Sequence, residues 1–159
     1  MWNIPVEEAE QRAIYSHEAG VVGNYRCFDN AISVLRRLSR LYDLVIVTSR
    51  RATLRLETDA WLEKHFPGLF KQIRYVGMWD ADQDFAHKIK QTKTEICREI
   101  GTGYLIDDQL KHCISAAEAG IEALLFGNYA WNRHDAELPR RITRVRNWED
   151  IARYFNVQD

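Results

Sequence analysis

The sequence has no apolar tract long enough to cross a membrane, although hydrophobic residues make up 46% of its 159 residues. Its first twenty residues lack the apolar core of a signal peptide and carry Glu7, Glu8, Glu10, Arg12 and Glu18 instead. Neither sign of charge dominates, because the formal net charge is -1, and this argues against a dedicated nucleic-acid-binding protein. These absences predict a cytoplasmic protein without a membrane partner.

Cysteine is also scarce. The chain contains three, Cys27, Cys97 and Cys113, an odd number without CxxC spacing. Neither a disulfide framework nor a zinc site is therefore indicated, and buried free thiols are expected. Internal repeats and low-complexity segments are lacking as well, and the length fits one domain with its own core.

What the sequence does contain is a regular alternation of short apolar runs and helical patterns from residue 44 onward. Strands are predicted at 44–48, 73–78, 104–108 and 123–126, and helices near 30–41, 54–66, 91–100, 110–119 and 148–155. This alternation is typical of an α/β fold in which helices cover both faces of a parallel sheet. Upstream, 5–19 is predicted as a helix, 21–28 as either a short strand or an extended connection, and 79–87 as a polar acidic connection.

The clearest helix follows Asp29 and Asn30, either of which can cap it. One apolar stripe is expected on this helix, formed by Ala31, Val34, Leu35, Leu38 and Leu41. Further along, the arginine cluster Arg140, Arg141, Arg144 and Arg146 is expected to be a solvated edge, or else a surface for an acidic partner. Trp79, Trp131 and Trp148 are expected to pack in the interior, with a pocket lining as the alternative.

Two of the predicted strands end abruptly in polar side chains. The run from Leu44 ends in Thr48 and Ser49, and the run from Tyr104 ends in Asp107 and Asp108. Because the carboxyl ends of parallel strands meet at one edge of a sheet, these groups are expected to converge there, with Lys93 from the helix before the second run.

This set of groups suits phosphoryl transfer. Adjacent carboxylates are costly to ionise together unless a cation shares the site, so the Asp107–Asp108 pair predicts Mg²⁺. A lysine offsets negative charge, and a hydroxyl donates to a phosphate oxygen. Simpler interpretations exist: Thr48 and Ser49 as turn caps, the acid pair as a helix cap, and Lys93 as a surface lysine, with Lys88 or Lys90 as the true partner.

Taken together, these segments resemble the haloacid dehalogenase (HAD) superfamily, and the chain is similar to its cytosolic deoxynucleotidase-like branch over roughly residues 28–155. The matching motifs are Leu44-Val-Ile-Val-Thr-Ser-Arg50, Lys93-Thr-Glu-Ile-Cys97 and Tyr104-Leu-Ile-Asp-Asp108, in the order that the family has them. The resemblance implies a three-layer Rossmann-like core over 28–159, preceded at 1–27 by a remnant of the family's cap segment.

The same resemblance implies a role for each matching residue. Thr48 would hold the phosphate of a phosphomonoester or nucleotide, Lys93 would stabilise that phosphate and the nucleophile, and Asp107 with Asp108 would coordinate Mg²⁺. Ser49 and Arg50 lie next to the phosphate position and are predicted to help bind it.

One motif of the family is missing. HAD phosphatases begin with a strand ending in Asp-x-Asp, whose first aspartate attacks phosphorus, but before Thr48 the only aspartates here are Asp29 and Asp43, and neither is predicted to end a strand. We expect the chain to begin after the nucleophile and to be inactive as a phosphatase. It is then either a truncated enzyme or a natural pseudoenzyme that binds a phosphorylated ligand or a partner protein.

The missing strand has a structural consequence as well. In the HAD fold it lies at the centre of the sheet, between the strands that end here in Thr48 and Asp108, so its loss leaves two strand edges without a neighbour. We expect another segment or a second subunit, as in a homodimer, to cover this edge. Direct pairing of strand 44–48 with strand 104–108 would contradict that expectation.

Overall fold

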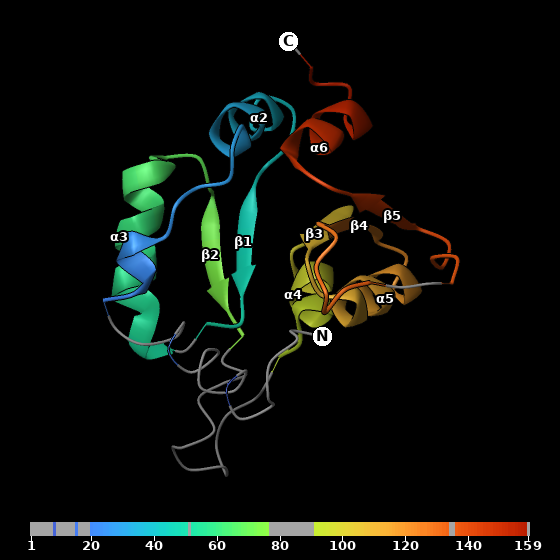
Figure 1. The fold of residues 1–159 in the computed structure, drawn as a ribbon, viewed down its shortest axis with the longest axis horizontal. Helices are drawn as coiled ribbons and strands as arrows, with labels where there is room; N and C mark the ends of the chain where they lie inside the picture. Colours follow the sequence, from blue (N-terminus) through green and yellow to red (C-terminus); the bar gives the residue numbers. More distant parts are fainter. Residues whose placement is uncertain are drawn as a thin grey trace. The chain divides into compact units, whose positions relative to one another are not determined.

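The computed structural model describes residues 20–50, 52–76, 91–133 and 136–158, together with Glu8 and Tyr15. The described residues up to Gln91 form one compact unit, here called the N-terminal unit, and those from Thr92 onward form the C-terminal unit. In each unit, helices follow parallel strands (Figure 1). The predicted α/β class with parallel strands is therefore confirmed.

The N-terminal unit contains two strands joined by a helix. Its elements are η1 (Val22–Asn24), α2 (Ala31–Leu38), β1 (Val45–Thr48), η2 (Ala52–Leu54), α3 (Arg55–His65) and β2 (Gln72–Tyr75). Strands β1 and β2 are parallel, with Val45 opposite Gln72 and Thr48 opposite Tyr75. Thr48 therefore lies at the carboxyl end of this small sheet, as predicted.

Helix α3 fixes the segment that precedes α2. The Glu57 carboxylate accepts hydrogen bonds from the backbone N–H groups of Gly20 and Gly23, at 2.9 and 2.8 Å, and the Trp61 indole donates to the Tyr25 carbonyl at 2.8 Å. Because this segment is bound to a helix, residues 21–28 form η1 and an extended connection. The alternative of a short strand there is wrong.

Helix α2 buries most of the predicted stripe: Ala31, Val34, Leu35 and Leu38 are buried. Leu41 is 64% exposed, because the helix ends at Leu38 and Leu41 lies in the turn beyond it. The capping prediction is only half right. Asn30 occupies the cap position in a left-handed conformation, with φ of 59°, but its side chain makes no capping hydrogen bond.

The C-terminal unit contains a three-stranded parallel sheet in the order β3–β4–β5. Its elements are α4 (Lys93–Glu99), β3 (Tyr104–Asp107), α5 (Leu110–Glu118), β4 (Glu122–Phe126), β5 (Ile142–Val145) and α6 (Trp148–Tyr154). The core on one side of the sheet is built by Cys97, Leu105, Cys113, Ala116, Ile121, Ala123, Leu125 and Ile142. Phe126, whose side chain alternates to the other face, lies 5.7 Å from the Trp148 ring of α6.

Strand β5 was not predicted. The segment around it was expected to be a solvated arginine edge, but Ile142 and Val145 are buried and Arg144 is half-buried. Arg141 does reach the surface, where it forms an ion pair with Glu122 of the neighbouring strand. Of the four arginines, Arg140, Arg141 and Arg146 flank the strand and are exposed, while Arg144 lies within it and is half-buried.

In the described part of the chain, the strands form two sheets, β1–β2 and β3–β4–β5, rather than one. Both polar-tipped strands, β1 and β3, are edge strands of their sheets. The three-layer HAD arrangement, the missing central strand and the cover over its neighbours stay predictions.

Several sequence predictions fall outside the described residues. They are the helix over 5–19 apart from Glu8 and Tyr15, the end of the strand predicted at 73–78, and the connection over 79–87. The domain boundary predicted at residue 28 stays a prediction. None of the helices in the described ranges combines the length and the apolar character that crossing a membrane needs.

Candidate functional site

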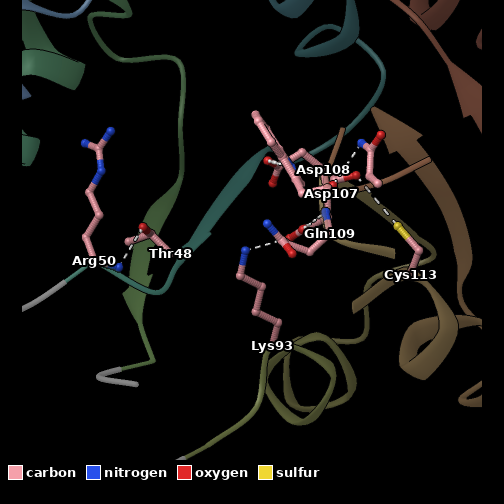
Figure 2. A network of polar contacts seen from close by, with 9 residues as sticks. Thr48, Arg50, Lys93, Asp107, Asp108, Gln109 and Cys113 are labelled. Carbon is pink, nitrogen blue, oxygen red and sulfur yellow. Dashed lines mark hydrogen bonds and ion pairs between the residues drawn. The ribbon is translucent and has the colours of Figure 1, made fainter. Parts of the chain in front are cut away.

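The strongest candidate site is a buried ion pair at the end of β3. The Lys93 ammonium lies 2.6 Å from Asp107 Oδ2, and only 13% and 4% of the two side chains are exposed (Figure 2). The other oxygen of Asp107 accepts a hydrogen bond from the backbone N–H of Gln109 at 2.8 Å, just before α5. The prediction that Lys93 and Asp107 come together is confirmed.

Lys93 owes its place to the start of α4. Thr92 caps this helix with its side chain, which accepts from the Glu95 N–H at 3.1 Å, while the Glu95 carboxylate accepts from the Thr92 N–H at 2.6 Å. This reciprocal capping box fixes where the helix begins. It places Lys93 at the first helical position. The hydrogen bonds that the Glu95 carboxylate accepts from the Thr92 N–H and the Thr92 hydroxyl lower the pKa of Glu95 below its ordinary value.

Asp108, the second acid of the pair, is held by the loop that follows β4. Its carboxylate accepts a hydrogen bond from the Trp131 indole N–H at 3.1 Å, and its backbone carbonyl accepts from the Asn132 side chain at 3.0 Å. Asn132 is fully buried and also donates to the Phe126 carbonyl at 2.8 Å. Asp108 is therefore tied to the neighbouring strand β4 rather than to Lys93.

Two buried cysteine thiols lie near the ion pair. Cys97 and Cys113 are buried, and the Cys113 thiol lies 3.7 Å from the Asp107 carbonyl. Burial, with the Asp107 charge adding to it, raises the pKa of Cys113 to about 12, and burial likewise raises the pKa of Cys97. The prediction of buried free thiols is confirmed for these two, while Cys27 is half-buried.

The other predicted polar strand end, at the carboxyl end of β1, belongs to the N-terminal unit. The Thr48 hydroxyl oxygen at the end of β1 accepts a hydrogen bond from the Arg50 N–H at 3.2 Å. The Arg50 guanidinium points away from Thr48 (Figure 2), donates to the Thr58 hydroxyl at 3.3 Å and lies 5.7 Å from the Tyr25 ring. Desolvation by burial lowers the pKa of this guanidinium.

Ser49 is an unusual member of this tip. Its hydroxyl oxygen is buried, and among the described residues it has no hydrogen-bond partner. A buried hydroxyl without a partner costs stability, so such an atom often marks a place where a ligand or water binds. Arg51, two residues after Ser49, lies outside the described ranges.

Neither of the two early aspartates lies at the carboxyl end of a strand. Asp29 is exposed in the turn before α2, and Asp43 precedes β1 at its amino end, where it pairs with Lys71 at 3.8 Å. Parallel α/β sheets bind ligands at the carboxyl ends of their strands. Asp29 and Asp43 are therefore not placed to attack a bound phosphate.

The acid pair does not complete a metal site by itself. In the ranges that the structure describes, no group of three or more histidine, cysteine, aspartate or glutamate side chains could hold a metal ion. A Mg²⁺ ion at Asp107 would share the carboxylate with an ammonium 2.6 Å away. The described residues alone therefore provide two carboxylates and no third protein ligand, no chemical step is assigned to Mg²⁺, and its binding stays a prediction.

The hydrogen-bond network that positions Asp108 was not predicted from the sequence. Its members are the buried Asn132 and the half-buried Arg144, which donates to the Gly127 carbonyl at 2.6 Å and to the Asn132 carbonyl at 2.7 Å. The useful pattern in the sequence was the abrupt change after β4, from an apolar strand to Gly127-Asn-Tyr-Ala-Trp-Asn132. It resembles the polar ends of β1 and β3 but carries no acid.

Comparison of the chain with models of protein families finds no match, and a search among curated proteins finds no relative.

Proposed function

We propose that this chain is a HAD-type domain that binds the phosphate group of a phosphomonoester at the carboxyl end of β3. The observation that supports this most directly is the buried Lys93–Asp107 pair next to Asp108. A lysine ammonium carries three N–H donors, and one of them faces Asp107, so the others can donate to phosphate oxygens. The partner that fits is a phosphorylated small molecule or a nucleotide.

Charge explains why Mg²⁺ belongs to this proposal. Lys93, Asp107 and Asp108 together carry a charge of -1, so a phosphate dianion would be repelled unless a cation came with it. Mg²⁺ commonly binds through one or two carboxylates together with substrate phosphate. Asp107 and Asp108 are the residues that would hold it, and the ion would neutralise the negative charge of the phosphate.

Thr48, Ser49 and Arg50, at the end of β1, are also proposed to bind phosphate, as the HAD resemblance implies. The Thr48 oxygen accepts from Arg50, which leaves the hydroxyl hydrogen as a donor, and the buried Ser49 hydroxyl is a second donor. Arg50 already donates to Thr58, so a phosphate contact would use its remaining N–H groups.

Binding without rapid turnover is the activity we propose for the chain. By the HAD resemblance, covalent phosphoryl transfer would need the first aspartate of an Asp-x-Asp motif, which the sequence before Thr48 does not contain. Loss of the nucleophile typically costs several orders of magnitude in rate. A pseudoenzyme that binds phosphorylated ligands is favoured by the internal engagement of the acid pair, since Asp107 and Asp108 both accept hydrogen bonds from the protein. An enzyme that takes its nucleophile from outside these 159 residues is the alternative.

The test is a calorimetric titration with inorganic phosphate, in the presence and absence of Mg²⁺. We expect the wild type to bind phosphate when Mg²⁺ is present, and the double variant Lys93→Met/Asp107→Leu to lose at least about tenfold in affinity, since it removes the charged donor and one acid. Lys71→Met, which removes one member of an exposed ion pair, is the matched control and should bind like wild type.

Two results would contradict the proposal. Lack of phosphate binding by the wild type under all these conditions would remove its basis. Fast hydrolysis of a phosphomonoester by the chain alone, abolished in Asp107→Ala, would show that the chain has a nucleophile and is an active phosphatase.

A further inference from the structure

The loop between β4 and β5 is built around one glycine and one buried amide. Gly127 has φ of +79°, and a Cβ atom there would lie 2.2 Å from the Tyr129 ring, so only glycine lets that ring fold back on the chain. The side chain of the fully buried Asn132 accepts from the Tyr129 N–H at 2.9 Å and donates to the Phe126 and Asp108 carbonyls. The loop is thereby fixed to the ends of both β3 and β4.

Arg144 secures the same loop from β5. Its guanidinium donates to the carbonyls of Gly127 and Asn132, which are the first and last residues of the segment 127–132 at the start of this loop. Hydrogen bonds from a charged donor are about twice as strong as neutral ones. Residues 127–132 are therefore fixed by hydrogen bonds at both ends and in the middle, and the segment is rigid.

This rigid loop presents an aromatic pair beside the candidate phosphate site. The rings of Tyr129 and Trp131 stack with centroids 4.6 Å apart and planes 14° from parallel, and the Trp131 indole N–H donates to Asp108. Trp131 nevertheless keeps 45% of its surface exposed. Because the polar atom of the indole is satisfied by Asp108, the exposed part of this side chain is apolar ring.

We propose that the Trp131–Tyr129 pair is a stacking platform for a planar aromatic ring, carried by a phosphomonoester whose phosphate lies at Lys93 and Asp108. The inference rests on the proposed phosphate site and adds the class of substrate. A ring held in place before binding loses little conformational freedom when a ligand stacks on it, which favours affinity.

A small ligand fits this surface better than a protein partner does. Among the described residues of the C-terminal unit, the large apolar side chains that are exposed are Trp131 and Tyr104, and these lie at opposite ends of β3, next to Asp108 and at the first residue. A protein interface would need a contiguous apolar patch. An exposed indole next to charged groups is suited to a small ligand that carries one aromatic ring and one anionic group.

The test compares two esters of the same size in the presence of Mg²⁺: phenyl phosphate, which is planar and aromatic, and cyclohexyl phosphate, which is neither. We expect wild-type protein to bind phenyl phosphate about three- to tenfold more tightly, the effect of one aromatic contact. Trp131→Phe, which keeps a ring, should retain most of this preference, and Trp131→Ala should abolish it. Tyr104→Ala, at the other end of β3, is the control and should bind as wild type does.

The outcomes separate the two proposals. If inorganic phosphate and both esters bind with equal affinity, or if Trp131→Ala keeps the full preference, the platform is wrong and the phosphate site stands. If neither phosphate nor either ester binds, both proposals fail. The comparison of esters on wild-type protein decides the matter even if Trp131→Ala does not fold.

Discussion

At the level of single residues, Lys93 and Asp107 meet 2.6 Å apart with 13% and 4% of their side chains exposed. Taking either charge away leaves the other buried without its partner. Replacing both with apolar side chains of similar size leaves no charge to compensate, and such replacements are often neutral or stabilising. The pair is therefore expected to matter more for binding than for the stability of the fold.

This difference gives a prediction for stability. Lys93→Met should lower the free energy of unfolding by about 3–5 kcal/mol, and Lys93→Met/Asp107→Leu should recover most of that loss. Urea denaturation of the two variants measures both quantities. Lys71→Met, in an exposed pair, should change stability by less than about 1 kcal/mol. A double variant as unstable as the single one would show that the ion pair itself stabilises the fold.

The thiols provide a second prediction at this scale, because the thiolate is the form that reacts. Burial raises the pKa of Cys113 to about 12, so near pH 8 almost none of this thiol is ionised in the folded protein. Burial also raises the pKa of Cys97, which lowers the fraction of its thiolate form. The half-buried Cys27 should react first with a disulfide reagent. In the native protein, Cys97 and Cys113 should react far more slowly than Cys27 even as the pH rises. They should react fully only after unfolding.

Counting reacted thiols by mass spectrometry at increasing times checks this order. Chain unfolded in urea is the control and should react at all three positions. Fast modification of two or more cysteines in native protein would contradict the buried positions of Cys97 and Cys113.

At the level of elements, β1 is an edge strand made almost entirely of apolar residues. The Lys71 N–H donates to the Leu44 carbonyl and the Val76 N–H donates to the Thr48 carbonyl, so these two residues face β2. Because backbone groups alternate along a strand, those of Val45 and Val47 face the opposite edge. In the described residues no strand pairs with that edge, and a two-stranded sheet is of marginal stability alone.

We expect a second copy of the chain to cover this edge, giving a homodimer. Sedimentation velocity over a wide range of protein concentration should show the dimer. Val47→Pro, which removes an N–H on the open edge without touching the β1–β2 hydrogen bonds, should shift the equilibrium toward monomer. Val47→Ala controls for the lost side-chain volume and should remain dimeric. A wild-type chain that is monomeric at every concentration would contradict the expectation.

Comparison of the observed helices and strands with the sequence shows which of them the sequence patterns predict. Strands β1, β3 and β4 and helices α4, α5 and α6 were predicted within a few residues, because each combines an apolar period with a clear start or stop, such as the capping Thr92. Strand β5 was missed because its two buried residues, Ile142 and Val145, are separated by two polar residues and so form neither an apolar run nor a period of two. Its inward-turning Arg144 is satisfied by carbonyls of a distant loop, which no local pattern reveals.

At the level of the whole molecule, the sequence predicted the class of fold but not how its strands are partitioned. Alternating strands and helices specify parallel pairing, yet periodicity does not say which strands are neighbours, and the described strands form two sheets. The site shows the same limit. Lys93 and Asp107 were predicted as partners from residue type and order, whereas the contacts of Asp108 depend on Trp131 and Asn132, which lie more than twenty residues away.

The hydrogen bonds from Arg144 to the two ends of segment 127–132 have a consequence for how this segment moves. Surface loops usually fluctuate independently on the nanosecond timescale, but this loop cannot release its ends without breaking contacts to β5. Its opening should therefore be coupled to the opening of the sheet, as part of one cooperative unit. The Tyr129 and Asn132 amides, which lie inside the loop, should then exchange with solvent deuterium at rates close to those of the strand residues.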